Sequence, residues 1–198
     1  MSQFQSIEVV PEVIRAAAEG LDAAQEIIYR ACERTVHTLI RRLIPNAAVA
    51  EDLFQEVCIE ILRSTAAFSG EGSFGGWVRA IAVNKCLGYL RSPWHRSLLW
   101  LDADEDMSLA IVDAAQRPDV QVAARCDLER ALDRLAPLTR SVVWLHDVEG
   151  YTHQEIGRLL GRTPSFSKSQ LARAHTRLRE LLDPSDESLP CTPISTSY

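Results

Sequence analysis

The sequence predicts an all-α protein of two small helical domains joined by an acidic linker, with a helix-turn-helix in the C-terminal domain. Three observations support this fold class. Residues 151–182 carry the start signals of two closely spaced helices. Residues 47–66 repeat apolar side chains with the period of a helix. Residues 96–120 are acidic and separate these two parts of the chain.

The C-terminal helix pair has clear start and stop signals. Thr152 and Glu155 have the spacing of a capping box, in which each side chain accepts a hydrogen bond from an unpaired amide. Gly161 breaks the first helix, and Thr163 followed by Pro164 starts a second one at once, since proline suits the first helical position. Two helices joined by a turn of about three residues predict a helix-turn-helix.

The second helix of this pair has an apolar stripe and a polar, basic surface. Such a helix is typical of the one that reads DNA, and Gly157 in the first helix leaves space for a close crossing. The alternative is an ordinary helical hairpin whose charged side faces solvent. The apolar stripe contains Leu171, Ala174, Leu178 and Leu181, and the other sides carry Lys168, Ser169, Gln170, Ala172, Arg173, Arg177 and Arg179.

The N-terminal half begins with residues 1–20, which lack a clear period and predict a weakly structured lead or a short helix. Apolar spacing then predicts a helix over residues 22–43 that Pro45 ends, and Asn46 can cap the next helix, over residues 47–66. On spacing alone, the polar side of that helix is a solvent-facing surface. It carries Glu51, Asp52, Gln55, Glu56 and Glu60.

Residues 68–77, F-S-G-E-G-S-F-G-G-W, form a glycine-rich loop with three aromatic side chains. Glycine permits unusual backbone angles, and aromatic rings in such a loop can stack on unpaired bases. The alternative is that the rings fill the core, which is expected more of Trp77 than of Phe74. A helix over residues 77–91 follows and forms the first basic block. Its outward side chains are Arg79, Asn84, Lys85 and Arg91.

A change of composition over residues 92–119, with prolines and the run D-A-D-E-D, predicts a linker at a domain boundary. Two support helices are expected at residues 121–136 and 139–148, on either side of Pro137. Residues 183–198 are rich in proline and serine and lack basic side chains, so they predict a disordered, acidic tail.

The formal net charge of −6 is unevenly distributed along the chain. Residues 63–101 hold five basic and one acidic side chain, and residues 151–182 hold six and two. A local positive potential therefore survives within an acidic total, which allows two separate contacts with DNA.

Several classes of protein are excluded by the sequence. No segment approaches the roughly 18 apolar residues of a membrane span, and no signal peptide is evident, so the expected location is the cytoplasm. The five cysteines lack the spacing of a disulfide framework or a zinc site. The histidines are scattered, and no catalytic constellation, metal site or cofactor is predicted. The scattered histidines are His37, His95, His146, His153 and His175.

The order of these parts resembles a bacterial RNA polymerase sigma factor of the extracytoplasmic-function group, which keeps only conserved regions 2 and 4. The resemblance spans about residues 21–182. It rests on A-E-D-L-F-Q-E-V at 50–57, F-S-G-E-G-S-F-G-G-W at 68–77, I-A-V-N-K at 81–85 with Y-L-R at 89–91, L-D-R-L-A-P-L-T-R at 132–140, Y-T-H-Q-E-I-G-R-L-L-G at 151–161 and K-S-Q-L-A-R-A-H-T-R-L-R at 168–179.

The resemblance implies a region 2 at residues 21–95, a connector at 96–120 that threads the positively charged polymerase cleft, and a region 4 at 121–182. The partners it implies are promoter DNA, the beta and beta-prime subunits of core RNA polymerase, and an anti-sigma factor. Core docking would use Asp52, Gln55 and Glu56. The minus-ten element would be bound by Phe68, Ser69, Gly70, Ser73, Phe74, Trp77, Arg79, Asn84, Lys85 and Arg91, with the loop and Asn84 holding a flipped base. The minus-thirty-five element would meet Lys168, Ser169, Gln170, Ala172 and Arg173, with Arg177 on phosphate.

Some positions depart from the family pattern, including Ser69, the pair Gly75 and Gly76, and Gln170, where basic or larger residues are frequent. Two other functions are consistent with parts of the sequence. One is a free-standing helix-turn-helix repressor or activator, and the other is a helical protein-interaction module. Neither accounts for both the acidic helix surface and the aromatic loop.

Overall fold

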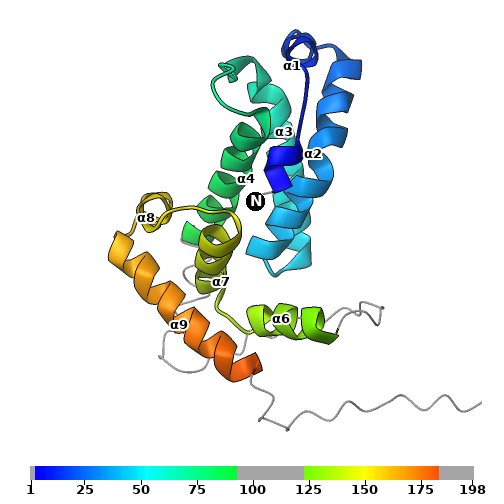
Figure 1. The fold of residues 1–198 in the computed structure, drawn as a ribbon. Helices are drawn as coiled ribbons and strands as arrows, with labels where there is room; N and C mark the ends of the chain where they lie inside the picture. Colours follow the sequence, from blue (N-terminus) through cyan, green and yellow to red (C-terminus); the bar gives the residue numbers. More distant parts are fainter. Residues whose placement is uncertain (1–2, 93–122, 183–198) are drawn as a thin grey trace, which may run out of the picture.

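The computed structural model of the chain describes residues 3–92 and 123–182. Within these ranges all regular secondary structure is helical, which confirms the predicted fold class. The helices form an N-terminal bundle and a smaller C-terminal group packed beside it (Figure 1). The N-terminal group contains η1 (Gln3–Ser6), α1 (Pro11–Ala18), α2 (Asp22–Leu43), α3 (Ala47–Ser64), η2 (Thr65–Ala67) and α4 (Phe74–Arg91). The C-terminal group contains α6 (Ala123–Asp133), α7 (Pro137–Val143), η3 (Trp144–Val148), α8 (His153–Leu160) and α9 (Pro164–Leu182).

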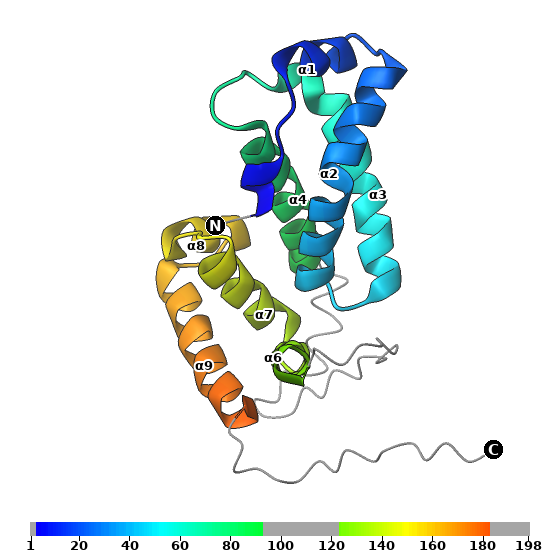
Figure 2. The ribbon, with the colours of Figure 1, turned by 45° about the vertical axis from the view of Figure 1, so that its right-hand side comes forward.

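Helices α2, α3 and α4 run alongside one another around an apolar core (Figure 2). Helix α2 has the predicted bounds, and Asn46 caps α3 by accepting a hydrogen bond from Val49 N at 3.2 Å. The apolar spacing of residues 22–43 predicts Ile27 on the buried face, and this prediction is wrong, because Ile27 is exposed whereas Ile28 is fully buried. The buried stripe of α2 advances in steps of four residues through Ile28, and Ile27 lies about 100° away from it around the helix.

Two helices start earlier than the sequence predicts. Helix α4 begins at Phe74 instead of residue 77, because Ser73 Oγ accepts a hydrogen bond from Gly76 N at 3.1 Å and caps the helix. Helix α7 begins at Pro137, which was expected to be a break between helices. Proline is well tolerated at the first helical position, where its amide would have no partner in any case.

The N-terminal lead is a folded part of the N-terminal bundle. It contains η1 and the short helix α1, so the short-helix alternative for residues 1–20 is right. Phe4 of η1 is only 2 % exposed, and η1 packs against α4 while α1 packs against α2 and η2. The expected linker at 96–120 and tail at 183–198 lie outside the described residues.

Among residues 3–92 and 123–182, no helix is both long and apolar enough to cross a bilayer.

Candidate nucleic-acid interface

The helix-turn-helix consists of α8, a tight turn and α9, as predicted. Thr152 Oγ1 accepts from Glu155 N at 3.2 Å, and Thr152 N donates to the Glu155 carboxylate at 2.8 Å, which completes the capping box. Thr152 Oγ1 also donates to the Glu155 carboxylate at 2.7 Å, and the hydrogen bonds that this carboxylate accepts from the Thr152 amide and hydroxyl lower the pKa of Glu155. Gly161 ends α8 with a φ of 63°, a left-handed conformation that suits glycine. Thr163 Oγ1 then accepts from the amide of Phe166 at 3.2 Å and caps α9.

Gly157 makes the close approach at this turn possible. A Cβ atom at this position would lie 2.9 Å from the backbone oxygen of Arg162 and 3.0 Å from the carbonyl carbon of Thr163. The close approach expected of the second helix at Gly157 therefore occurs where that helix starts. The atoms that Gly157 accommodates are the backbone of the turn and the first residue of α9, so it fixes where α9 starts.

Helix α9 separates its apolar and polar side chains around its axis. Leu171, Ala174 and Leu178 are buried against the rest of the domain. Gln170, expected on the outward side, is half-buried, and its Oε1 accepts a hydrogen bond from Thr139 Oγ1 of α7 at 2.7 Å. Gln170 lies next to the buried stripe of α9, which explains why its side chain contacts α7 and does not face outward. The predicted contacts that are exposed are Lys168, Ser169, Ala172, Arg173 and Arg177.

Three histidines that look scattered in the sequence meet beside α9. The rings of His146 and His153 stack with centroids 4.4 Å apart, and the Asp147 carboxylate lies 2.8 Å from His146 Nδ1 and 2.7 Å from His175 Nε2. Burial alone would raise the pKa of Asp147, but the two histidine hydrogen bonds outweigh it and lower the pKa. The pKa of His153 is lowered by burial, then by His146 and Lys168. Sequence spacing carries no signal for this cluster, because three different elements supply it.

The aromatic loop before α4 has a packed base and an exposed tip. The rings of Phe68, Phe74 and Trp77 lie within 5.3–5.6 Å of one another, centroid to centroid. Phe74 is only 5 % exposed and is more buried than Trp77, which reverses the expected order. Its ring therefore supports the loop from the core and is not positioned to stack on a base. At the tip, Ser69, Gly70 and Ser73 are exposed.

The remaining predicted minus-ten residues lie along α4. Asn84 and Arg91 are exposed, and Arg91 Nε donates to the carbonyl of Leu87 at 3.3 Å. Lys85 Nζ lies 3.5 Å from a carboxylate oxygen of Glu56 on α3. The proposed docking residues and the basic side of α4 are therefore neighbours. Asp52, Gln55 and Glu56 are all exposed on α3.

Arg79 is the one predicted DNA contact that faces the other domain. Its Nη1 donates to the backbone carbonyl of Glu149 at 2.9 Å and lies 3.7 Å from that residue's carboxylate, and its guanidinium stacks over Tyr151 at 4.8 Å. The Glu149 side chain is only 5 % exposed. A second contact joins Arg42 of α2 to Glu129 of α6 at 2.6 Å. In this arrangement the Arg79 guanidinium is engaged by Glu149 and Tyr151, and 28 % of its side chain is exposed.

The contact between the domains is incompletely paired. Within the part of the chain that the structure describes, the buried side-chain atoms without a hydrogen-bond partner are Arg41 Nη1, Arg79 Nε and Trp144 Nε1. Trp144 and Arg79 belong to this contact, since the Arg42 guanidinium stacks over Trp144 at 5.3 Å. Each buried donor left unpaired costs about 1–3 kcal/mol, so these donors lower the stability of the contact between the domains.

Replacing Glu149 with alanine should loosen the contact between the domains. The change removes the carboxylate that faces Arg79. In the protein without polymerase or DNA, the two domains should then separate more often, and the molecule should expand. Small-angle X-ray scattering should show a larger radius of gyration than the parent chain has. Glu19→Ala, which removes an exposed carboxylate from the lead, should leave the radius unchanged, and an unchanged radius in both variants would contradict the prediction.

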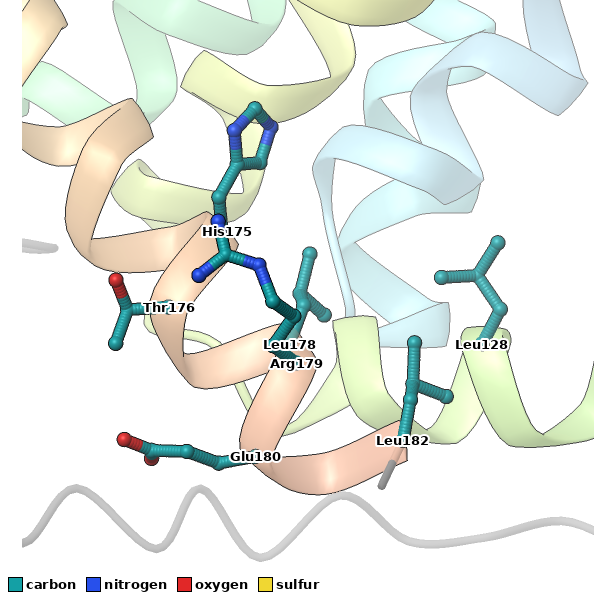
Figure 3. A pocket seen from close by; sticks show the side chains of 7 residues that line it. All are labelled: Leu128, His175, Thr176, Leu178, Arg179, Glu180 and Leu182. Atoms are coloured by element: carbon teal, nitrogen blue, oxygen red, sulfur yellow. The ribbon is translucent and has the colours of Figure 1, made fainter. Parts of the chain in front are cut away.

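An apolar groove lies between α6 and the end of α9 (Figure 3). Leu128 and Leu182 are exposed at its edges, with Leu178 at its base and His175 and Arg179 on the α9 side. None of the residues that line the groove was predicted to be a site residue. Arg179 was predicted only as one of the outward side chains of the basic helix. Among the described residues, no group of histidine, cysteine and carboxylate side chains could hold a metal ion.

Comparison with known proteins identifies both domains. The family model described as sigma-70 region 2 matches residues 28–96, and the model described as sigma-70, region 4 matches residues 127–178. The RNA polymerase sigma factor CarQ of Myxococcus xanthus is 32 % identical over 162 residues, which cover 81 % of this chain and 90 % of CarQ. The ECF sigma factor SigM of Mycobacterium tuberculosis is 28 % identical over 171 residues, covering 86 % of this chain and 83 % of SigM.

A solved structure shares the fold. The sigma factor RpoE of Bartonella quintana, determined in complex with the anti-sigma factor NepR, aligns over 81 % of this chain and 96 % of RpoE, with a TM-score of 0.51 and 24 % identity. Both conserved regions occur in order, and CarQ is matched over most of its length. The chain therefore belongs to the extracytoplasmic-function group of RNA polymerase sigma factors, which direct promoter-specific transcription.

Proposed function

We propose that this sigma factor docks on core RNA polymerase through α3, reads the minus-thirty-five element with α9, and opens the minus-ten element with the aromatic loop and α4. The observation that carries the proposal is the division of α9 into a buried apolar stripe and an exposed surface with Lys168 and Arg173. A capped helix of this kind after a tight turn enters the major groove in known helix-turn-helix proteins. It acts by binding and needs no catalytic group.

The first test is a pull-down of core RNA polymerase with the purified chain, followed by run-off transcription on genomic DNA of the source organism. Association together with new, specific start sites is the expected result. Binding to duplex DNA without polymerase would instead favour a free-standing repressor or activator.

The double change Asp52→Ala and Gln55→Ala should weaken binding to core polymerase. Both side chains are exposed on α3, so the loss should come from the docking surface and not from unfolding. Fluorescence anisotropy with labelled protein measures the affinity, and we expect a loss of about tenfold or more, since interface residues that matter cost more than about 1 kcal/mol when truncated. Glu26→Ala on α2 is the control. Equal affinity of the double variant and the parent would remove α3 from the docking surface.

Arg173→Ala should relax promoter selectivity. An arginine that contacts a base edge in the major groove contributes about 1 to 3 kcal/mol of discrimination, or about 5- to 160-fold. Competition between promoters that differ in single minus-thirty-five bases measures this preference. Arg177→Ala is the matched control, because a phosphate contact should weaken binding to all sequences alike. If both variants lose affinity uniformly, Arg173 makes no base contact.

Strand opening is assigned to the exposed tip of the aromatic loop and to Asn84. An unpaired base is captured by a pocket that offers hydrogen bonds and stacking, and the basic side chains of α4 can hold the displaced strand. Arg79 can take part only after it leaves Glu149, so its contact with DNA requires the two domains to separate.

The finer organisation is also part of the proposal. We place the polymerase-docking and minus-ten functions in residues 21–95 and the minus-thirty-five function in residues 121–182, with residues 96–120 as the connector and 183–198 as an acidic tail. A chain that works on core polymerase and chromosomal DNA acts in the cytoplasm. Its expected regulator is an anti-sigma protein, a partner that RpoE of Bartonella quintana has in its solved complex.

A further inference from the structure

The N-terminal lead contacts both ends of the aromatic loop. The loop leaves the bundle after η2 and returns to it at Phe74, the start of α4. Helix α1 packs against η2, and η1 packs against α4. Figures 1 and 2 both show the lead rising beside α4 and crossing to α1 at the end of the bundle where the loop emerges. The two fixed points of the loop are thus held by one short segment of the chain.

The contact at the second fixed point is unusually close. A Cβ atom on Gly75 would lie 1.9 Å from the backbone oxygen of Phe4, 3.0 Å from its carbonyl carbon and 3.2 Å from Ile7 Cβ. Position 75 must be glycine if η1 is to keep its position, since side-chain rotation cannot move the backbone carbonyl of Phe4 away from a Cβ atom.

The side chains of the lead secure this contact. Phe4 is 2 % exposed and Ile7 is 6 % exposed, so both are anchored in the core. Ile7 N donates to Phe4 O at 3.2 Å, which holds the turn of η1 over Gly75. The neighbouring residue of Gly75, Phe74, belongs to the aromatic cluster at the base of the loop. A shift of η1 would therefore change the direction in which the loop leaves α4.

We propose that η1, through Phe4 seated on Gly75, positions the aromatic loop for opening of the minus-ten element. Phe4 acts through Gly75 and Phe74 and does not itself touch DNA, so it is a positioning residue. The proposal rests on the proposed function, because it assigns to the loop the strand-opening role given above. It also gives a reason for the glycine at position 75, because any side chain there would displace η1.

The experiment uses the full chain bound to core polymerase, at a promoter identified by run-off transcription. Strand opening is followed by 2-aminopurine fluorescence in the minus-ten element, on duplex DNA and on a template with a pre-melted minus-ten bubble. A misplaced loop captures the unpaired base less well, and contact with an unpaired base is strong enough that Phe4→Ala should slow opening of duplex DNA by about tenfold or more. On the pre-melted template, where no base pair has to be opened, its open-complex yield and transcription should lie within about twofold of the parent chain.

Gly75→Ala provides a second variant that leaves the Phe4 ring intact. Its new methyl group meets the Phe4 carbonyl, so it should slow duplex opening in the same way. The Phe4→Ala and Gly75→Ala double variant should be no slower than either single variant, since both act on the same contact. Val10→Ala is the matched control, because Val10 is an apolar residue of the lead that is 58 % exposed.

The outcomes separate the possibilities. Equal losses on duplex and pre-melted templates, or a parallel loss of core-polymerase binding, would assign Phe4 a role in folding alone and overturn the proposal. Normal opening by both single variants would also overturn it. If the parent chain neither binds core polymerase nor opens promoters, the proposed function itself fails, whatever the variants do.

Discussion

Replacing Asp133 with alanine should lower the free energy of unfolding of the C-terminal domain by about 2 kcal/mol, less than the cost of unpairing a fully buried charge because the Asp133 side chain is 42 % exposed. Asp133 pairs with Arg140, whose side chain is only 6 % exposed. Burial lowers the pKa of Arg140, Asp133 opposes this, and Arg42 and Arg41 lower it further. Without the carboxylate, the guanidinium would remain charged, buried and close to two other arginines. Urea denaturation followed by circular dichroism measures the change.

Two variants make this prediction specific. Arg140→Leu combined with Asp133→Ala should recover most of the lost stability, because it removes the buried charge as well as its partner. Glu180→Ala breaks the exposed pair with Arg177 and should change stability by less than about 0.5 kcal/mol. A similarly small effect of Asp133→Ala would show that Arg140 is solvated well enough to need no carboxylate.

Gly157→Val should destabilise the helix-turn-helix by about 3 kcal/mol, because it inserts a branched side chain where no space exists. The Cβ atom alone would lie 2.9 Å from Arg162 O and 3.1 Å from Pro164 N, and these backbone atoms cannot rotate away. Relief requires the turn to open, which shifts α9 relative to α8. Promoter binding should therefore fall together with stability, as measured by electrophoretic mobility shift with the polymerase holoenzyme and by urea denaturation.

Gly88→Val is the matched control for this substitution. Gly88 lies in the last turn of α4, and a Cβ atom there would have no heavy atom within 4 Å. Valine is a slightly better helix former than glycine, so this variant should stay within about 0.5 kcal/mol of the parent chain. If Gly157→Val behaved like Gly88→Val, the turn would be more adaptable than its packing indicates.

The local signals in the sequence were sufficient for most of the helices. Asn46, Thr152 and Thr163 each satisfy unpaired backbone amides within three residues, so the positions of these caps follow from short-range chemistry. Pro137 and Phe74 show where this reasoning fails. Proline both ends and starts helices, and a serine cap can start a helix at residues with low helix propensity. The sequence alone therefore did not decide whether Pro137 and Phe74 belong to the helices that follow them.

The candidate site could be predicted less completely. The outward positions of Arg173 and Asn84 follow from helical periodicity on an amphipathic helix. The environments of Gln170 and Arg79 do not, because each side chain bonds to a residue of another element, Thr139 and Glu149 respectively. The same is true of the histidines around Asp147. Contacts between elements distant in the sequence depend on how helices cross, which periodicity does not encode.

The sequence by itself determined the helical class, the two-part organisation, the helix-turn-helix and the family to which the chain is similar. Each of these depends on spacing over a few residues, because caps, apolar stripes and motif strings are local. The tertiary structure alone decided that Phe4 lies on Gly75, that Arg79 is held by Glu149 and that Arg140 is buried with Asp133. These contacts join segments that meet only when the core forms, since burial of apolar surface brings distant helices together without regard to their order in the chain.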